Sequence, residues 1–166
     1  MTSSSSLHCN VFLSFRGTDT RKTFISHLYQ ALVDRGITTF KDDETITIGK
    51  PFPQEILTAI QNSIFAIITI SKNFASSMWC LIELQSIMKL QNRKQYVIVP
   101  IFYGVKPSDL RDEEGDFLKQ LKQLKEGDFL KQLKEGDISS FVEEVLKWKA
   151  ALKNVSTLQG KNPTDL

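Results

Sequence analysis

A doubly wound α/β fold with a parallel sheet is the fold class predicted by this sequence of 166 residues. Short, continuously apolar runs recur along the chain, as expected for strands buried on both faces. Segments with helical apolar spacing separate these runs, and the resulting β-α-β-α-β-α-β order favours parallel strands joined by right-handed crossovers. We therefore expect a flavodoxin-like sheet of about five strands, in the order 2-1-3-4-5, with helices on both faces.

The first quarter of the chain supplies two strands and the helix between them. Residues 9–15 and 37–40 are short runs rich in β-branched and aromatic side chains, so each predicts a strand. The segment 20–36 between them has the spacing of an amphipathic helix. Its inward face is expected to carry Phe24, Leu28, Leu32 and Val33, with Ile25 and Ala31 on its flanks.

The middle of the chain continues the alternation. A helix is expected to begin near Pro51, because proline is tolerated in a first turn. Its buried side chains should be Ile56, Leu57 and Ile60. The run 64–70 is the most hydrophobic in the chain and predicts the central strand, followed by a helix over 77–91 and a buried strand over 96–103.

The last third contains a duplication. The nine residues at 114–122 recur unchanged at 126–134, and two copies are too few for a solenoid. We interpret the segment 114–134 as a local duplication that lengthens a surface connection through an amphipathic helix. This helix should bury Leu118, Leu121 and Leu124 and break at Gly127 and Gly136. A final helix over 139–158 should turn Phe141, Val145, Trp148 and Leu152 inward.

The composition excludes several classes of protein. The net charge of +2 and the scattered basic residues argue against nucleic acid as a partner. No apolar run reaches the roughly 20 residues that span a bilayer, so no membrane partner is expected. Cys9 and Cys80 form no disulfide framework, which favours a reduced, cytoplasmic setting with the nucleus as an alternative. The two histidines lack the spacing of metal ligands, so no metal site is predicted.

Four loops should meet at the carboxyl ends of the strands, where ligands of such sheets bind. Glu83 lies near the start of the helix that follows the third strand, and Trp79 lies one turn before it on the same face. An aromatic ring beside a carboxylate suits a ligand with a flat ring and a cationic centre. Arg16 and Gly17, after the first strand, resemble a phosphate or ribose contact.

Simpler interpretations compete with this site. Glu83 would be a solvated residue on a helix face, Trp79 a packing residue and Cys80 a small buried hydrophobe. Asp42 and Asp43 would be loop or capping residues. Spacing alone does not identify an enzyme.

Four stretches together resemble the plant branch of the Toll/interleukin-1 receptor (TIR) domain family. They are "VFLSFRGTDTRKTFISHLYQALVDRGITTFKDD", "SSMWCLIEL", "VPIFYGVKPSDLR" and "VLKWKAALKNV". The resemblance covers residues 9–158, between a Ser-rich, disordered N-terminus (1–8) and a disordered tail (159–166). It implies the flavodoxin-like fold and a role in the signalling of plant innate immunity, either as a TIR-only protein or as an excised domain.

The resemblance also implies an activity, the hydrolysis of NAD+ to nicotinamide and signals derived from ADP-ribose. The catalytic glutamate of the family corresponds to Glu83. The residues that would bind the substrate correspond to Phe15, Arg16, Gly17, Trp79, Cys80 and Lys50. The resemblance implies NAD+ as a substrate, with NADP+ as a second candidate, and no required cofactor, although a divalent cation is a candidate aid. A carboxylate suits this reaction because the departure of nicotinamide creates positive charge on the ribose.

Self-association is the third implication. Ser26 and His27 correspond to a symmetric contact between two copies, and Gly115 lies near a second contact. The loop 42–50 of a neighbouring subunit would complete the active site, and other TIR-containing immune receptors are expected partners. The loop departs from the family in one respect: Ile48 stands where a basic residue is usual, and Lys50 follows the glycine.

Three hypotheses follow. The first is an oligomeric NAD+-cleaving signalling enzyme, an NAD+ nucleosidase. The second is a non-catalytic module that passes a signal through contacts between TIR domains, and Ile48 favours it. The third, a receiver-like phosphoacceptor, is disfavoured because no aspartate ends the third strand.

Overall fold

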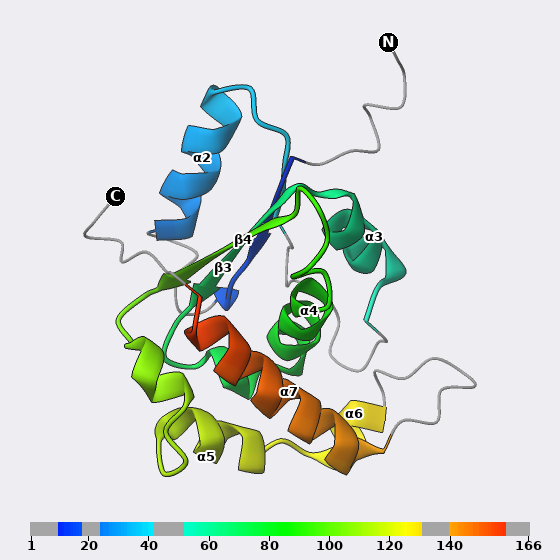
Figure 1. The fold of residues 1–166 in the computed structure, drawn as a ribbon, viewed down its shortest axis with the longest axis vertical. Helices are drawn as coiled ribbons and strands as arrows, with labels where there is room; N and C mark the ends of the chain where they lie inside the picture. Colours follow the sequence, from blue (N-terminus) through cyan, green and yellow to red (C-terminus); the bar gives the residue numbers. More distant parts are fainter. Residues whose placement is uncertain (1–9, 18–23, 42–51, 131–139, 159–166) are drawn as a thin grey trace.

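The computed structural model describes residues 10–17, 24–41, 52–130 and 140–158. Figure 1 shows a twisted sheet with helices packed around it. The elements in chain order are β1 (Val11–Ser14), α2 (Ser26–Asp34), β2 (Thr39–Lys41), α3 (Gln54–Asn62), β3 (Phe65–Ile70), the 3-10 helix η3 (Phe74–Ser76), α4 (Met78–Met88), β4 (Val97–Phe102), the 3-10 helix η4 (Pro107–Leu110), α5 (Asp116–Lys122), α6 (Glu126–Leu130) and α7 (Phe141–Ser156). The predicted disordered ends, 1–8 and 159–166, lie outside the described residues.

The strands form a parallel sheet in the order β2-β1-β3-β4. Val11 of β1 is in register with Thr39 of β2 and with Phe65 of β3, and Phe65 is in register with Val97 of β4. The parallel, flavodoxin-like arrangement is confirmed. The described residues contain four strands and no fifth one, so β4 is an edge of the described sheet. Pro100 suits this place, because a residue without a backbone N–H is usually confined to edge strands.

Side chains along β1 alternate between the two faces of the sheet and pack in a different hydrophobic cluster on each face. The buried cluster beside α2 consists of Val11, Leu13, Phe15 and Ile25. Phe12 points the other way, into the larger cluster that includes buried side chains of α3, α4 and α7. Helices therefore pack on both faces, as predicted (Figure 1). Because successive strand residues alternate between faces, Ser14 emerges on the same face as Phe12, toward α4.

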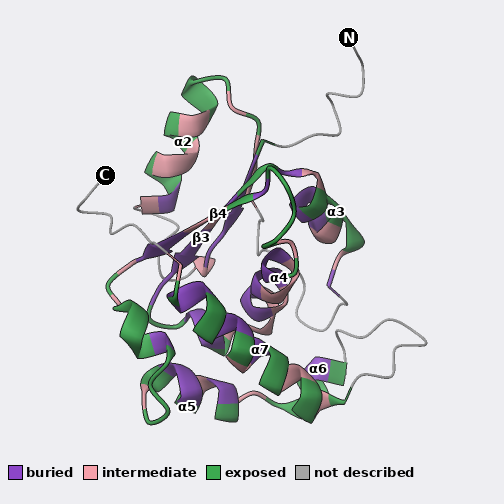
Figure 2. Ribbon diagram, in the orientation of Figure 1, coloured by how far each residue is buried: buried purple, intermediate pink, exposed green. Residues whose placement is uncertain are grey.

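The inward face of α2 differs from the prediction. Val33, expected inward, is 42% exposed, whereas Ile25, expected on a flank, is completely buried. Leu28 and Leu32 are half-buried and pack against the cluster around Ile25. These three residues define the inward stripe, and Val33 is turned about 100° beyond Leu32 on the helix. Figure 2 shows α2 largely exposed or intermediate, while α4 is mostly buried.

The helix α3 begins later than predicted. It starts at Gln54 with Pro53 as its N-cap, in an extended conformation with φ −68° and ψ 136°, and the predicted start near Pro51 lies outside the described residues. A proline disfavours helical backbone geometry at the residue before it, so Pro53 keeps Phe52 out of the helix. The side chain of Phe52 is buried in the larger cluster instead. The three side chains expected to pack are buried or half-buried, namely Ile56, Leu57 and Ile60.

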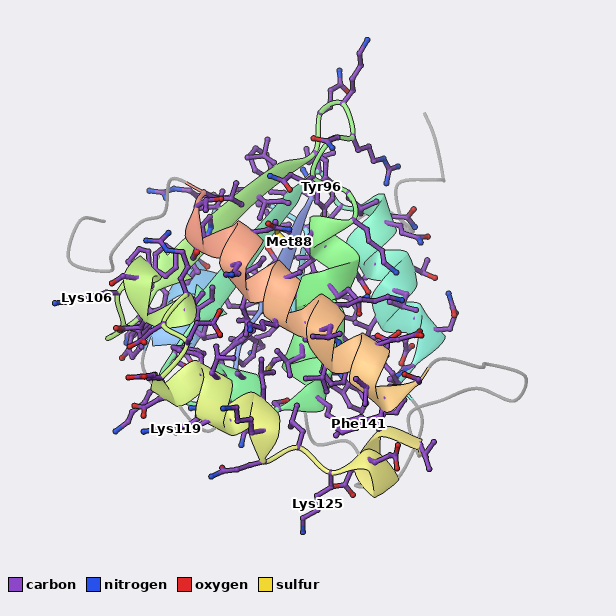
Figure 3. All side chains as sticks on the ribbon, turned by 60° about the horizontal axis from the view of Figure 1, so that its bottom comes forward. Met88, Tyr96, Lys106, Lys119, Lys125 and Phe141 are labelled. Carbon is purple, nitrogen blue, oxygen red and sulfur yellow. The ribbon has the colours of Figure 1, made fainter. Side chains whose placement is uncertain are left out.

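The two copies of the duplicated sequence lie in different environments. Phe117 in α5 and Phe129 in α6 occupy equivalent positions, and both are buried, with 2% and 3% of their surface exposed. The next pair differs, because Leu118 is 7% exposed and Leu130 is 57% exposed. Among the described residues, identical sequence therefore buries the leucine of α5 and exposes the equivalent leucine of α6, while the aromatic ring is buried in both. The exposed Lys119 and Lys125 mark the outer side of this region (Figure 3).

The expected break at Gly127 is wrong in position. The helix α5 ends at Lys122, before Gly127, and Gly127 lies inside α6. Leu124, expected on the buried face of a continuous helix, lies between the two helices and is half-buried. A Cβ at Gly127 would meet no atom within 4 Å, so no neighbouring group requires glycine at this position. Gly136 lies outside the described residues.

The last helix, α7, crosses the larger cluster as predicted. Trp148 and Leu152 are completely buried, and Phe141 and Val145 are half-buried. The Ser140 hydroxyl caps the helix by accepting a hydrogen bond of 3.0 Å from the backbone N–H of Glu143. Figure 3 shows α7 running across this face, with Phe141 at its start beside α6. In the described ranges, no helix combines the length and the apolar character that a membrane crossing requires.

Tyr96, just before β4, gives a prediction about stability at high pH. Its ring is 8% exposed, its hydroxyl has no hydrogen-bond partner among the described residues, and burial raises its pKa to about 12, although Arg93 opposes the shift. The unfolded chain releases this proton near pH 10, so Tyr96 should destabilise the fold as the pH rises from about 10 to about 12. In urea unfolding, the free energy of unfolding of Tyr96→Phe relative to that of the wild type should be higher at pH 11 than at pH 8. An equal difference at both pH values would contradict this.

Candidate functional site

Two segments predicted to meet at the carboxyl edge of the sheet are in contact there. Residues 14–17 end β1 and continue beyond it, and residues 77–83 form the start of α4, which follows β3 and η3. Two hydrogen bonds join the segments, one between side chains and one from a side chain to the backbone. The site is therefore built where a doubly wound sheet places its ligands.

Glu83 is buried, with 2% of its surface exposed. The Ser14 hydroxyl donates a hydrogen bond of 2.7 Å to Glu83 Oε1. The interpretation of Glu83 as a solvated helix-face residue is therefore wrong. Burying an ionised carboxylate costs several kcal/mol unless hydrogen bonds replace its water. A carboxylate held in this way at a ligand-binding edge is a candidate for chemistry.

Cys80 connects the same two segments. It is completely buried and free, and its thiol donates to the backbone carbonyl of Phe15 at 3.5 Å. Its backbone N–H donates to the hydroxyl of Ser77, the N-cap of α4, at 3.2 Å. The expectation of a small buried side chain is confirmed. The cap and the thiol together fix where α4 begins relative to the end of β1.

Trp79 packs against Phe52, which precedes α3. The two ring centroids are 5.0 Å apart and the planes are inclined by 51°. The Trp79 side chain is half-buried, and its indole N–H is buried with no hydrogen-bond partner in the part of the chain that the structure describes. The packing role therefore accounts for the ring in this structure, and part of its surface remains open to solvent.

The residues after β1 divide between core and surface. The side chain of Phe15 is 3% exposed and packs in the cluster beside α2, so it offers this site its carbonyl rather than its ring. Arg16 and Gly17 are half-exposed beside the same edge. A guanidinium followed by a glycine offers a charged fork and backbone N–H groups at the same edge of the sheet.

The predicted self-association residues lie on the surface, apart from this site. Ser26 and His27 are both exposed at the start of α2. Gly115 is the N-cap of α5 and half-exposed. It lines a polar cleft of about 480 Å³, whose other lining residues are Lys72, Gly104, Val105, Asp109, Asp112, Asp116 and Phe117. None of these lining residues belongs to the segments that hold Glu83.

Several predicted residues cannot be placed. Lys50 and Ile48, together with the loop 42–50 and its acidic pair, lie outside the described residues. Within the described ranges, no group of three or more His, Cys, Asp or Glu side chains has the geometry of a metal site.

Two residues of this region, Ser14 and Phe52, were not predicted from the sequence to contact the site. The apolar run 9–15 places Ser14 only in a strand, although the alternation along 11–15 puts it on the face of the following helices. The expected helix start near Pro51 places Phe52 in a first turn, and the restriction that Pro53 imposes moves it out of that turn. Both residues contact predicted site residues.

Comparison with known proteins agrees with the fold. The family model of the TIR domain matches residues 9–165. The chain is 42% identical over 158 residues to the TMV resistance protein N of Nicotiana glutinosa, and this match covers 95% of the chain and 13% of that protein. It is 39% identical over 151 residues to the disease resistance protein RPV1 of Vitis rotundifolia, covering 91% of the chain and 10% of that protein.

A solved structure resembles the chain along nearly its whole length. The TIR domains of the activated Roq1 resistosome, which directly recognises the pathogen effector XopQ, are 38% identical to it, with a TM-score of 0.75. The match covers 93% of this chain and 87% of that one. The chain thus spans about a tenth of the length of the curated relatives named above but nearly all of a TIR domain. The chain belongs to the TIR domain family, and to the branch of that family found in plant disease resistance proteins.

Proposed function

We propose that this TIR domain hydrolyses NAD+ at its nicotinamide–ribose bond and does so in a self-associated state that signals in plant immunity. The observation that carries the proposal is the buried carboxylate of Glu83, which accepts a hydrogen bond from Ser14 at the carboxyl edge of the sheet, the edge at which Arg16 and Gly17 follow β1. The membership of the family supports it, since the resemblance implies this activity for the glutamate at this position.

Hydrolysis of the nicotinamide–ribose bond is favoured by a negative charge beside the ribose. The bond between the ribose carbon and the nicotinamide nitrogen breaks, and nicotinamide leaves with the bonding electrons. The ribosyl centre becomes cationic, and a water molecule adds to it and loses a proton, which gives ADP-ribose. The Glu83 carboxylate would stabilise the cationic ribose or hold its hydroxyls. Arg16 and the Gly17 backbone would bind the pyrophosphate, and Trp79 would lie beside the flat nicotinamide ring.

Assembly is part of the proposal for a physical reason. With 2% of its surface exposed, Glu83 is shielded in the single chain, so a substrate reaches it only after a rearrangement. Ser26 and His27 are exposed at the start of α2, on a surface that a second copy would contact. The similar TIR domains of the Roq1 resistosome belong to an activated assembly, which supports self-association as the active state of this chain. No cofactor is needed for this hydrolysis.

A non-catalytic interaction module is the second candidate. The same burial of Glu83 favours it, because a carboxylate that stays closed off has a structural role only. The basic residue missing at Ile48 removes one phosphate contact that the family offers. Under this hypothesis the signal passes through contacts between TIR domains without catalysis, including the one expected at Ser26 and His27.

The dependence of turnover on association separates the two candidates. We expect nicotinamide release per mole of protein to rise with protein concentration. His27→Ala should weaken self-association by roughly tenfold and lower release in parallel, because a central contact residue is lost. Because the His27 side chain is exposed, the substitution should leave the free energy of unfolding within about 0.5 kcal/mol of the wild type. Light scattering measures the association, and the release of nicotinamide from NAD+ measures the turnover.

The exposed Lys89, at the end of α4, provides the control. Lys89→Ala should match the wild type in association and in release. Association without release at any concentration would remove the enzymatic proposal and leave the interaction module.

A further inference from the structure

We infer that Ser14 is a positioning residue for Glu83, and that its hydroxyl holds the carboxylate in the orientation that the reaction uses. The inference rests on the proposed function, because that function gives Glu83 its chemical task. It assigns a role to a residue that sequence reasoning places in the core of the sheet.

The contact joins two buried side chains. Ser14 is completely buried and Glu83 is 2% exposed, and the distance from Ser14 Oγ to Glu83 Oε1 is 2.7 Å. The residues are 69 positions apart in the sequence, so the tertiary fold alone brings them together. A hydrogen bond to a charged acceptor is about twice as strong as one between neutral groups, and little water competes for it here.

The donor stands on a rigid frame. Ser14 is the last residue of β1 and is in register with Ile68 of β3. The next residue, Phe15, is anchored by its buried ring and receives the Cys80 thiol at its carbonyl. The pairing of β1 with β3 and the buried ring of Phe15 both fix the backbone of Ser14. A donor fixed in this way on a strand can hold a functional group more accurately than one on a loop.

The effect on Glu83 is geometric. A glutamate side chain has three rotatable bonds and its terminal torsion is broad, so a hydrogen bond from a fixed donor constrains the orientation of its carboxylate. A hydrogen bond to Oε1 that persists when the site opens to the substrate holds one orientation, which is the preorganisation that electrostatic catalysis requires. Ser14 itself is completely buried and acts through Glu83 rather than on the substrate.

The test compares two serines with similar burial and the same bond length. Ser63 is 4% exposed, and its hydroxyl donates a hydrogen bond of 2.7 Å to the Ala59 carbonyl. It precedes β3, so it lies at the amino edge of the sheet, opposite Glu83. We expect Ser14→Ala to lower kcat for nicotinamide release from NAD+ by about 10- to 100-fold with little change in KM. Ser14→Thr, which keeps the hydroxyl and suits a strand, should restore most of kcat, and Ser63→Ala should leave both constants unchanged.

Each outcome decides between the proposals. Wild-type kcat in Ser14→Ala, together with an inactive Glu83→Gln, would overturn the positioning role and leave the proposed function intact. Equal losses in Ser14→Ala and Ser14→Thr, at matched thermal stability, would also overturn it, because the hydroxyl would then not matter. Turnover that survives in Glu83→Gln would overturn the proposed function, and the positioning role would fall with it.

Discussion

Replacing Glu83 with glutamine is expected to abolish nicotinamide release from NAD+ while the fold persists. The amide has nearly the shape of the carboxylate but no negative charge, so it cannot stabilise a cationic ribose. Loss of one preorganised electrostatic group typically costs about 10²–10³ in kcat, and we expect at least about a hundredfold here. The Ser14 hydroxyl can still donate to the amide oxygen, so the free energy of unfolding should fall by no more than about 2 kcal/mol.

The glutamine is a sharper test than an alanine, because alanine would also leave a cavity in a region that is almost completely buried. Glu143→Gln provides the matched control. It makes the same chemical change at an exposed position in the first turn of α7, outside the segments 14–17 and 77–83. Release should stay at the wild-type level in this variant. If Glu83→Gln also kept that level while folding normally, Glu83 would be a structural residue and the interaction module would be the better account.

The sheet was predictable because its signal is strong and local. The runs 9–15, 64–70 and 96–103 are apolar at almost every position, which fits strands covered on both faces, and β1, β3 and β4 lie within them. The parallel order followed from helices between strands. The edge at which the site would form followed from the topology, so the meeting of Arg16 and Glu83 at one edge was foreseeable from the sequence.

What the sequence did not foresee depends on contacts between distant segments. The burial of Glu83 and its bond to Ser14 arise from the face on which β1 presents Ser14, and helical spacing within α4 does not contain that information. The packing of Trp79 on Phe52 depends on where α3 begins, and the restriction from Pro53 decided that. Roles that entered through the family resemblance, such as those of Cys80 and His27, had no signal of their own in spacing.

The duplication shows the same limit most clearly. Copies of identical sequence carry identical local propensities, yet Leu118 is buried and Leu130 is exposed. Their fates differ because α5 packs along its face against η3 and η4, whereas α6 contacts α7 through Phe129. Tertiary packing, rather than propensity, sets the burial of each described position, and spacing alone misplaces the break near Gly127.

The second large effect is expected at Trp148, because this ring joins the duplicated segment to the core. Trp148 is completely buried, and Phe129 approaches it edge-on, with ring centroids 6.0 Å apart and planes inclined by 77°. Trp148→Ala should lower the free energy of unfolding by about 3–5 kcal/mol, the usual cost of removing a large aromatic side chain from a core. Urea unfolding followed by circular dichroism measures this loss.

Two further variants separate the causes of that loss. Leu146, on the same helix, is 60% exposed, so Leu146→Ala should change the free energy of unfolding by no more than about 0.5 kcal/mol. Trp148→Phe should cost less than the alanine, because it keeps a ring and removes an indole N–H that has no hydrogen-bond partner among the described residues. A similar small cost for Trp148→Ala and Leu146→Ala would mean that α7 does not support the core. The site at Glu83 would then depend on the sheet and on α3 and α4 alone.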